Sequence, residues 1–70
     1  MRLSPRARVQ MLRYRVRVAD VWQVVASADL VGLDEDGCPF YAAAVDDRMI
    51  YVIVTWGNPS FVKIVRARRR

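Results

Sequence analysis

The chain has 70 residues, of which 54% are hydrophobic and 27% charged, and its formal net charge is +5. This length predicts one small domain, residues 1–70, and excludes a two-domain enzyme. A chain of this size buries only about 60% of the surface that it exposes when unfolded, so we expect a homodimer or a complex with a partner.

Several kinds of chemistry are disfavoured by composition. Histidine is absent and Cys38 is the one cysteine, so the usual general base, the commonest metal ligand and an internal disulfide are missing. The acidic residues at 34–36 and 46–47 fall in predicted turns, where aspartates cap their own backbone. We therefore expect no metal and no cofactor. The arginine-rich start lacks the apolar core of a signal peptide, and no apolar run approaches the roughly 20 residues that span a bilayer, which predicts a cytoplasmic protein with no membrane association.

Charge is segregated into three blocks along the chain. Residues 1–17 contain six arginines and no acid, residues 18–47 contain all seven acids and no base, and residues 48–70 contain six bases and no acid. Because the ends of compact chains often meet, the two basic blocks are expected to form one positive face that suits a polyanion. The alternative interpretation is that these arginines are solubilising surface charges, with residues 67–70 forming a basic tail.

Two amphipathic helices are predicted first. A serine followed by proline at 4–5 is typical of a helix start, which places the first helix at about residues 5–16. This helix has apolar residues on both sides, so one side is available to a partner. Strict alternation over residues 13–18 leaves a strand as a competing interpretation. The second helix is expected at about residues 19–28, with Trp22 on its core-facing side.

Turn signals then separate a series of strands. The middle of this region is apolar on both faces, as a central strand with both faces covered requires. The sequence therefore predicts an α+β fold in which two N-terminal helices pack on a three- to four-stranded antiparallel sheet. The expected strands cover residues 30–33, 39–45, 48–56 and 60–66.

Two segments resemble a known group of small proteins. Residues 3–16, with the Asp-Val pair at 20–21, are similar to the pattern His-Ala-x-x-Arg-Met-x-x-Arg-Gly-Ile followed by an Asp-Val helix. Residues 48–54 and 62–69 are similar to closing strands of the type Arg-Ile-Ile-Ser-Ala-Arg-Lys. Over about half its length the chain thus resembles the RelE/BrnT-like toxin superfamily. The histidine, the two arginines and the glycine of the opening pattern are replaced here by Arg6, Gln10, Tyr14 and Arg15.

The resemblance implies a toxin that cleaves RNA without a metal, or blocks translation, and is held silent by a cognate antitoxin. Lys63 and Arg68 match the closing pattern and are carried over as catalytic residues. Because arginine stays protonated, an acid of the middle block, a lysine or a tyrosine must move the proton, which adds Tyr51 as a catalytic candidate beside Tyr41. The alternative for the tyrosines is a structural role in the sheet, and for Lys63 an exposed strand position.

RNA binding requires fewer kinds of functional group than RNA cleavage. Arginines contact phosphates through paired donors, and exposed aromatic rings stack on bases. Two other functions remain open: a non-catalytic phage or mobile-element protein that binds a host protein or nucleic acid, and a small oligomeric assembly protein. The partners expected are accordingly RNA or the ribosome, an antitoxin or host protein, or a second copy of the chain. The RNA-binding candidates are Arg6, Arg13, Arg48, Arg66 and Trp56.

Overall fold

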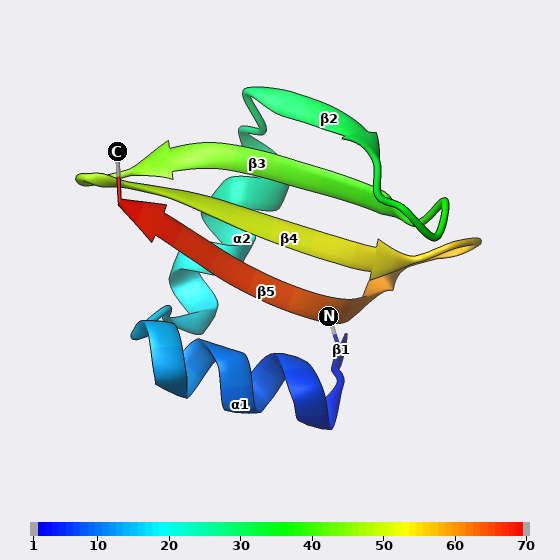
Figure 1. Ribbon diagram of the computed structural model, residues 1–70, viewed down its shortest axis with the longest axis horizontal. Helices are drawn as coiled ribbons and strands as arrows, with labels where there is room; N and C mark the ends of the chain where they lie inside the picture. The colour runs from blue at the N-terminus through cyan, green and yellow to red at the C-terminus, as the bar shows by residue number, and fades with distance from the viewer. Residues whose placement is uncertain (1, 70) are drawn as a thin grey trace.

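The computed structural model describes residues 2–69, without the side chains of residues 58–60, as two helices on one side of a five-stranded sheet (Figure 1). The sheet has the order β1-β5-β4-β3-β2, and every neighbouring pair is antiparallel except β1 and β5, which are parallel. The elements in chain order are β1 Arg2–Leu3, α1 Pro5–Tyr14, α2 Val18–Ala26, β2 Leu30–Leu33, β3 Pro39–Val45, β4 Arg48–Thr55 and β5 Asn58–Arg69.

The α+β class and the two helices are as predicted, but the sheet is larger and mixed. The additional strand, β1, pairs with β5 and is only two residues long. Two residues are too few to show the alternation by which a strand is predicted from sequence. Residues 67–69, expected as a basic tail, continue β5, since Arg69 pairs with Arg48 of β4. Residue 70 lies outside the described residues. β5 is therefore longer than predicted at both ends.

The start of α1 is as the sequence predicts. Ser4 Oγ accepts a hydrogen bond from the Ala7 N–H at 2.9 Å, and Pro5 is the first helical residue. The same serine joins the helix to the sheet, because its N–H donates to the Val62 carbonyl at 2.9 Å and its hydroxyl donates to the Lys63 carbonyl at 2.7 Å. One side chain thus caps α1 and fixes its position beside β5.

The end of α1 comes at Tyr14 instead of residue 16. Arg15 adopts a left-handed conformation with φ of 56°, and the next amide, that of Val16, donates back to the Met11 carbonyl at 2.8 Å. This arrangement closes the helix and buries Val16, so residues 13–18 form no strand. Glycine is preferred at such a position, and Arg15 stands where the resembled pattern has its glycine.

We expect Arg15→Gly to raise the free energy of unfolding by about 0.5–1 kcal/mol, because the left-handed conformation is strained for a residue with a Cβ. In a domain of this size the melting temperature, followed by circular dichroism, should rise by about 4 °C. The control Arg13→Gly places glycine inside the last turn of α1 and should destabilise by about 1 kcal/mol. Loss of stability in both variants would contradict this account.

The start of α2 is held by an acidic side chain. The buried Asp20 carboxylate accepts the Arg17 N–H at 2.9 Å and two guanidinium hydrogen bonds at 3.3 and 3.0 Å. The side-chain hydrogen bonds with Arg17 are the main reason that the pKa of Asp20 lies below its ordinary value. The helix itself ends at Ala26, two residues before the predicted end.

A carboxyl group with a lowered pKa in the folded protein stabilises the fold above its ordinary pKa near 4, and this contribution is lost as pH falls through the folded value. We therefore expect Asp20→Asn to lower the free energy of unfolding by about 1 kcal/mol at neutral pH. The difference from wild type should shrink in urea titrations carried down to about pH 2. Asp47→Asn, in an exposed turn, is the control. A difference for Asp20→Asn that does not change with pH would refute the carboxylate's role.

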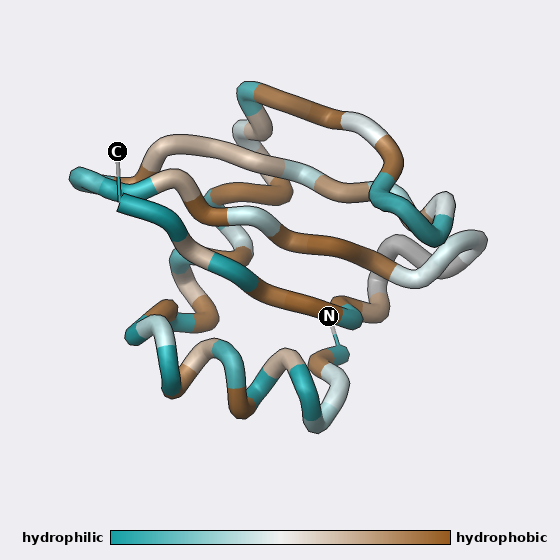
Figure 2. Tube along the Cα trace, viewed as in Figure 1, coloured by the Kyte–Doolittle hydropathy of each residue, from teal (hydrophilic) through white to brown (hydrophobic). Residues whose placement is uncertain are grey.

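The hydrophobic core lies between the helices and one face of the sheet. α2 packs against β3 and β4, and α1 packs against β5. Figure 2 shows the corresponding hydrophobic stretches along the central strands and hydrophilic residues towards the end of β5. Neither helix in the described part of the chain is long and apolar enough to cross a membrane. The buried core residues are Ala7, Met11, Val16, Val21, Val24, Ala43, Val45, Ile50, Val52, Val54, Val62 and Val65.

The two edges of the sheet differ. β1 pairs with the first part of β5, and farther along the same edge Gln10 Oε1 accepts a hydrogen bond from the Val65 N–H at 2.9 Å. A side chain of α1 thus takes the place of a neighbouring strand. Gln10 stands at the first arginine of the resembled pattern, so this departure has a structural role. At the opposite edge, β2 pairs within residues 2–69 with β3 alone.

Candidate nucleic-acid interface

The face of the sheet opposite the helices, here called the open face, combines aromatic, aliphatic and basic side chains. On β4, residues 50, 52 and 54 belong to the core beneath the helices, so alternation turns residues 49, 51 and 53 to the open face. The register then aligns three rows across the strands. These rows are Phe40, Ile53 and Ile64; Leu30, Ala42, Tyr51 and Arg66; and Ala44, Met49 and Arg68.

The first row forms a small hydrophobic cluster on this face. Ile53 and Ile64 are buried together with Cys38, and Phe40 packs against them. The Phe40 ring extends over β2, where a Cβ added at Gly32 would lie 2.9 Å from a ring carbon. The glycine therefore leaves room for an aromatic ring that spreads across the sheet.

A shallow hollow of about 440 Å³ opens beside this cluster. Its lining includes Tyr51, Arg66 and Arg68, together with the Phe40 ring and Ile53. Tyr51 and Arg66 are direct neighbours across β4 and β5, and Arg68 lies one row farther along the same strand face. Two of the predicted catalytic residues and one predicted RNA-binding residue are thus brought together.

The third predicted catalytic residue, Lys63, lies elsewhere. It is the extra residue of a bulge in β5, between the pairs Val62 with Val54 and Ile64 with Ile53. Its Nζ is 3.7 Å from Cys38 Sγ, beside the hydrophobic cluster and outside the hollow that Tyr51 and Arg68 line.

The other RNA-binding candidates do not join the hollow. Arg6 and Arg13 are exposed on α1, and Trp56 is 69% exposed in the turn between β4 and β5. Arg48 instead donates to two carbonyl groups at the C-terminal end of α1. Because that end of a helix carries partial negative charge, Arg48 holds the helix against the sheet.

Two acidic residues at the rim of the hollow were not expected there. Asp34 Oδ1 accepts the N–H groups of Asp36 at 2.9 Å and Cys38 at 2.8 Å, so Asp34 caps a turn as predicted. Its neighbour Glu35 is exposed and lines the same hollow as Tyr51. Only the pairing of β2 with β3 brings this turn to the open face, so no local signal could have revealed it. Within residues 2–69, no three His, Cys, Asp or Glu residues are grouped as metal ligands would be.

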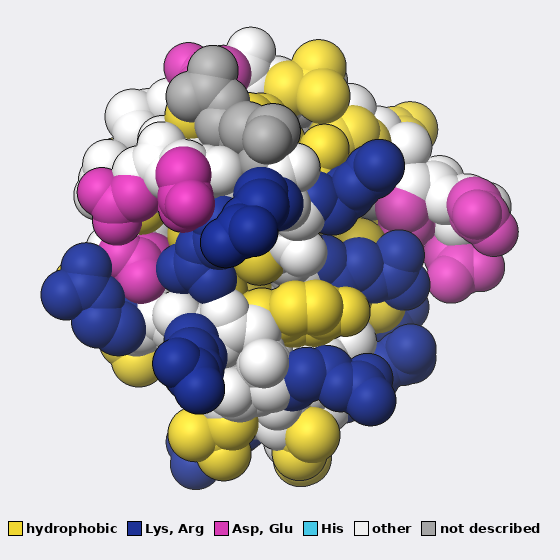
Figure 3. All heavy atoms as spheres, turned by 60° about the vertical axis from the view of Figure 1, so that its left-hand side comes forward, with side chains coloured by type: hydrophobic (Ala, Val, Ile, Leu, Met, Phe, Trp, Pro, Cys, Tyr) yellow, Lys and Arg dark blue, Asp and Glu magenta, His cyan; other side chains and the backbone are white. Residues whose placement is uncertain are grey.

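The two basic blocks of the chain lie beside each other, but the chain ends do not meet as expected, because Arg2 pairs with Phe61 at the start of β5 and Arg69 lies at the other end of that strand. β1 runs beside β5, and α1 packs along β5. Figure 3 shows Lys and Arg side chains across the middle of the side on which β5 ends, with Asp and Glu side chains toward both margins. Since α1 lies on the core side and Arg66 and Arg68 lie on the open face, the positive charge continues around the edge of the sheet instead of forming one flat face.

Comparison with protein-family models, curated proteins and solved structures finds no match for this chain. The resemblance to the toxin superfamily therefore depends on the two sequence segments alone.

Proposed function

We propose that this chain is a toxin-like protein of the RelE/BrnT type that binds single-stranded RNA on its open face and interferes with translation. The observation that carries the proposal is the gathering of Tyr51, Arg66, Arg68 and the Phe40 ring around one hollow. Proteins that bind single-stranded RNA combine cations for the phosphates with aromatic surfaces for the bases. A cognate antitoxin and a cytoplasmic location belong to the same proposal.

Each group has a defined part in binding. Arg66 and Arg68 are two residues apart on one strand, which places their Cα atoms about 7 Å apart on the same face. Both are exposed, so their guanidinium groups are available to neighbouring phosphates as paired donors. Phe40 and Tyr51, on adjacent strands, provide ring surfaces on which bases stack.

The same hollow supports metal-independent cleavage. The 2′-oxygen of a ribose loses its proton to the Glu35 carboxylate and bonds to the adjacent phosphorus, the bond to the 5′-oxygen breaks, and the Tyr51 hydroxyl donates a proton to that leaving oxygen. Arg66 and Arg68 stabilise the negative charge that develops on the phosphate oxygens. The products are a cyclic 2′,3′-phosphate and a free 5′-hydroxyl.

A second candidate function is RNA binding without cleavage. Two observations favour it: Lys63 lies outside the hollow, and the residue at the histidine position of the resembled pattern, Arg6, is exposed on α1. Such a protein would use the same arginines and rings to occupy RNA. Cleavage products therefore distinguish the two candidates.

The binding prediction uses charge reversal at two pairs of arginines. Arg66→Glu with Arg68→Glu should weaken binding of a short, fluorescein-labelled single-stranded RNA by about tenfold or more at fixed salt. The control pair, Arg6→Glu with Arg13→Glu, changes the net charge equally but lies on α1, and should weaken binding much less. Equal weakening by both pairs, measured by fluorescence anisotropy, would place the RNA elsewhere than the open face.

Cleavage is tested on the same RNA in the presence of a metal chelator. Wild type should produce cyclic phosphate ends, and Tyr51→Phe and Glu35→Gln should each slow cleavage by about a hundredfold or more with RNA affinity nearly unchanged. Binding without products would support the second candidate. Cleavage that persists in both variants would show that these two residues do not transfer the protons.

A further inference from the structure

A second surface lies on the other side of the molecule, along the helices. Leu12 is 83% exposed on α1 and Trp22 is 54% exposed on α2. The sequence predicted Trp22 in the core, but α2 packs through Val21 and Val24, which are fully buried. Since one residue advances a helix by about 100°, Trp22 is turned away from the sheet beside them.

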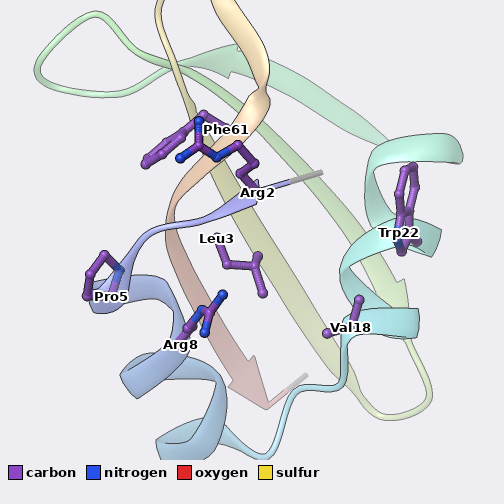
Figure 4. Close-up of a pocket in the computed structure, with 7 residues that line it drawn as sticks. All are labelled: Arg2, Leu3, Pro5, Arg8, Val18, Trp22 and Phe61. Carbon is purple, nitrogen blue, oxygen red and sulfur yellow. The ribbon is translucent and has the colours of Figure 1, made fainter.

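These exposed side chains border a continuous groove. Two hollows of about 580 and 540 Å³ adjoin each other, because Leu3, Arg8 and Val18 line both of them. Figure 4 shows Leu3 and Val18 between Arg8 on one side and Trp22 on the other. We call this feature the α1–α2 groove. Its apolar lining includes Leu3, Met11, Leu12, Val16, Val18 and Trp22.

The charge around the groove has one sign. Arg2, Arg8 and Arg17 line the two hollows, and no carboxylate occurs among the described lining residues. Because the Arg17 guanidinium is already paired with the Asp20 carboxylate at 3.0 Å, Arg2 and Arg8 are the main cations offered to a partner. The Arg2 guanidinium lies over the Phe61 ring, 5.8 Å from its centre, which keeps this cation at the rim. If two copies of the chain docked through this groove, the arginines of one copy would face those of the other and repel them. Charge complementarity therefore favours an acidic partner over a second copy.

We propose that the α1–α2 groove binds an amphipathic helix of a partner protein, with apolar side chains in the groove and acidic side chains against its arginines. A groove between two helices offers side-chain ridges, whereas the backbone groups within α1 and α2 are already paired inside each helix. The edge strand β1 also lines the groove, but its two residues are too few to template an added strand. The groove therefore suits a helix with apolar residues at i, i+3, i+4 and i+7, not an added strand. This inference does not depend on the proposed RNA function, which uses the opposite side of the sheet.

The test uses a synthetic peptide of about 18 residues, long enough to form a helix, with leucines at that spacing and glutamates elsewhere. The protein is prepared as Trp56→Phe, which leaves Trp22 as its one indole. Binding should be saturable and should shift the Trp22 emission to shorter wavelength as the ring leaves water. A peptide with lysines in place of the glutamates should cause no shift. Absence of saturable binding, or equal binding of both peptides, would overturn the proposal.

Variants of the groove locate the binding. Arg8→Glu should weaken affinity for the acidic peptide by about tenfold, whereas Arg13→Glu makes the same charge change on α1 outside the groove and should have little effect. Both side chains are exposed, so circular dichroism should show both variants folded. Equal effects would count against the groove.

Sedimentation of the peptide-free protein tests the competing occupant. We expect no self-association through this groove; a wild-type dimer that Trp22→Ala dissociates would assign the groove to a second copy and overturn the proposal. RNA affinity is measured on the same variants. Arg8→Glu should leave RNA affinity nearly unchanged. A wrong groove proposal would therefore show in the peptide affinities, and a wrong RNA proposal would show in the RNA affinities.

Discussion

The attachment of α1 to β5 determines which surfaces this molecule presents. Ser4 and Gln10 bond side chains of the helical segment to backbone groups of the strand, and Gln10 satisfies the N–H of the fully buried Val65. Leaving such a group without a partner costs about 1–3 kcal/mol. This contact closes one sheet edge and directs the helices to one face, so the other face is formed by side chains of the strands and of the turn between β2 and β3.

The two surfaces that result both carry arginines, with Asp34 and Glu35 also at the rim of the open-face hollow. They differ further in their apolar parts. The open face offers Phe40 and Tyr51 beside two arginines on a single strand, and flat rings suit nucleobases. The α1–α2 groove offers aliphatic side chains and one indole between two helices. Such a ridged apolar surface suits the side chains of another helix. The two proposals therefore place an RNA and a protein partner on opposite sides of one small sheet.

Residues that depart from the toxin-like pattern occupy defined places in the structure. Gln10 caps a strand edge, and Arg15 occupies a left-handed position that favours glycine. Arg6, at the histidine position, is exposed on α1. The opening motif therefore contributes none of the residues of the open-face hollow.

Local physics made much of the fold predictable from the sequence. The start of α1 follows from a capping serine before a proline, and β3 and β4 follow from apolar runs between turn residues, since these signals act over a few residues. The position of Trp22, the strand β1 and the placement of Glu35 and Tyr51 around one hollow depended on tertiary structure. For Tyr51 and Arg66 the decisive feature is the register of β4 with β5, which shifts at the bulge containing Lys63. A slip of one residue would turn a strand's side chains to the other face, and only packing of the valine-rich core against both helices selects the register.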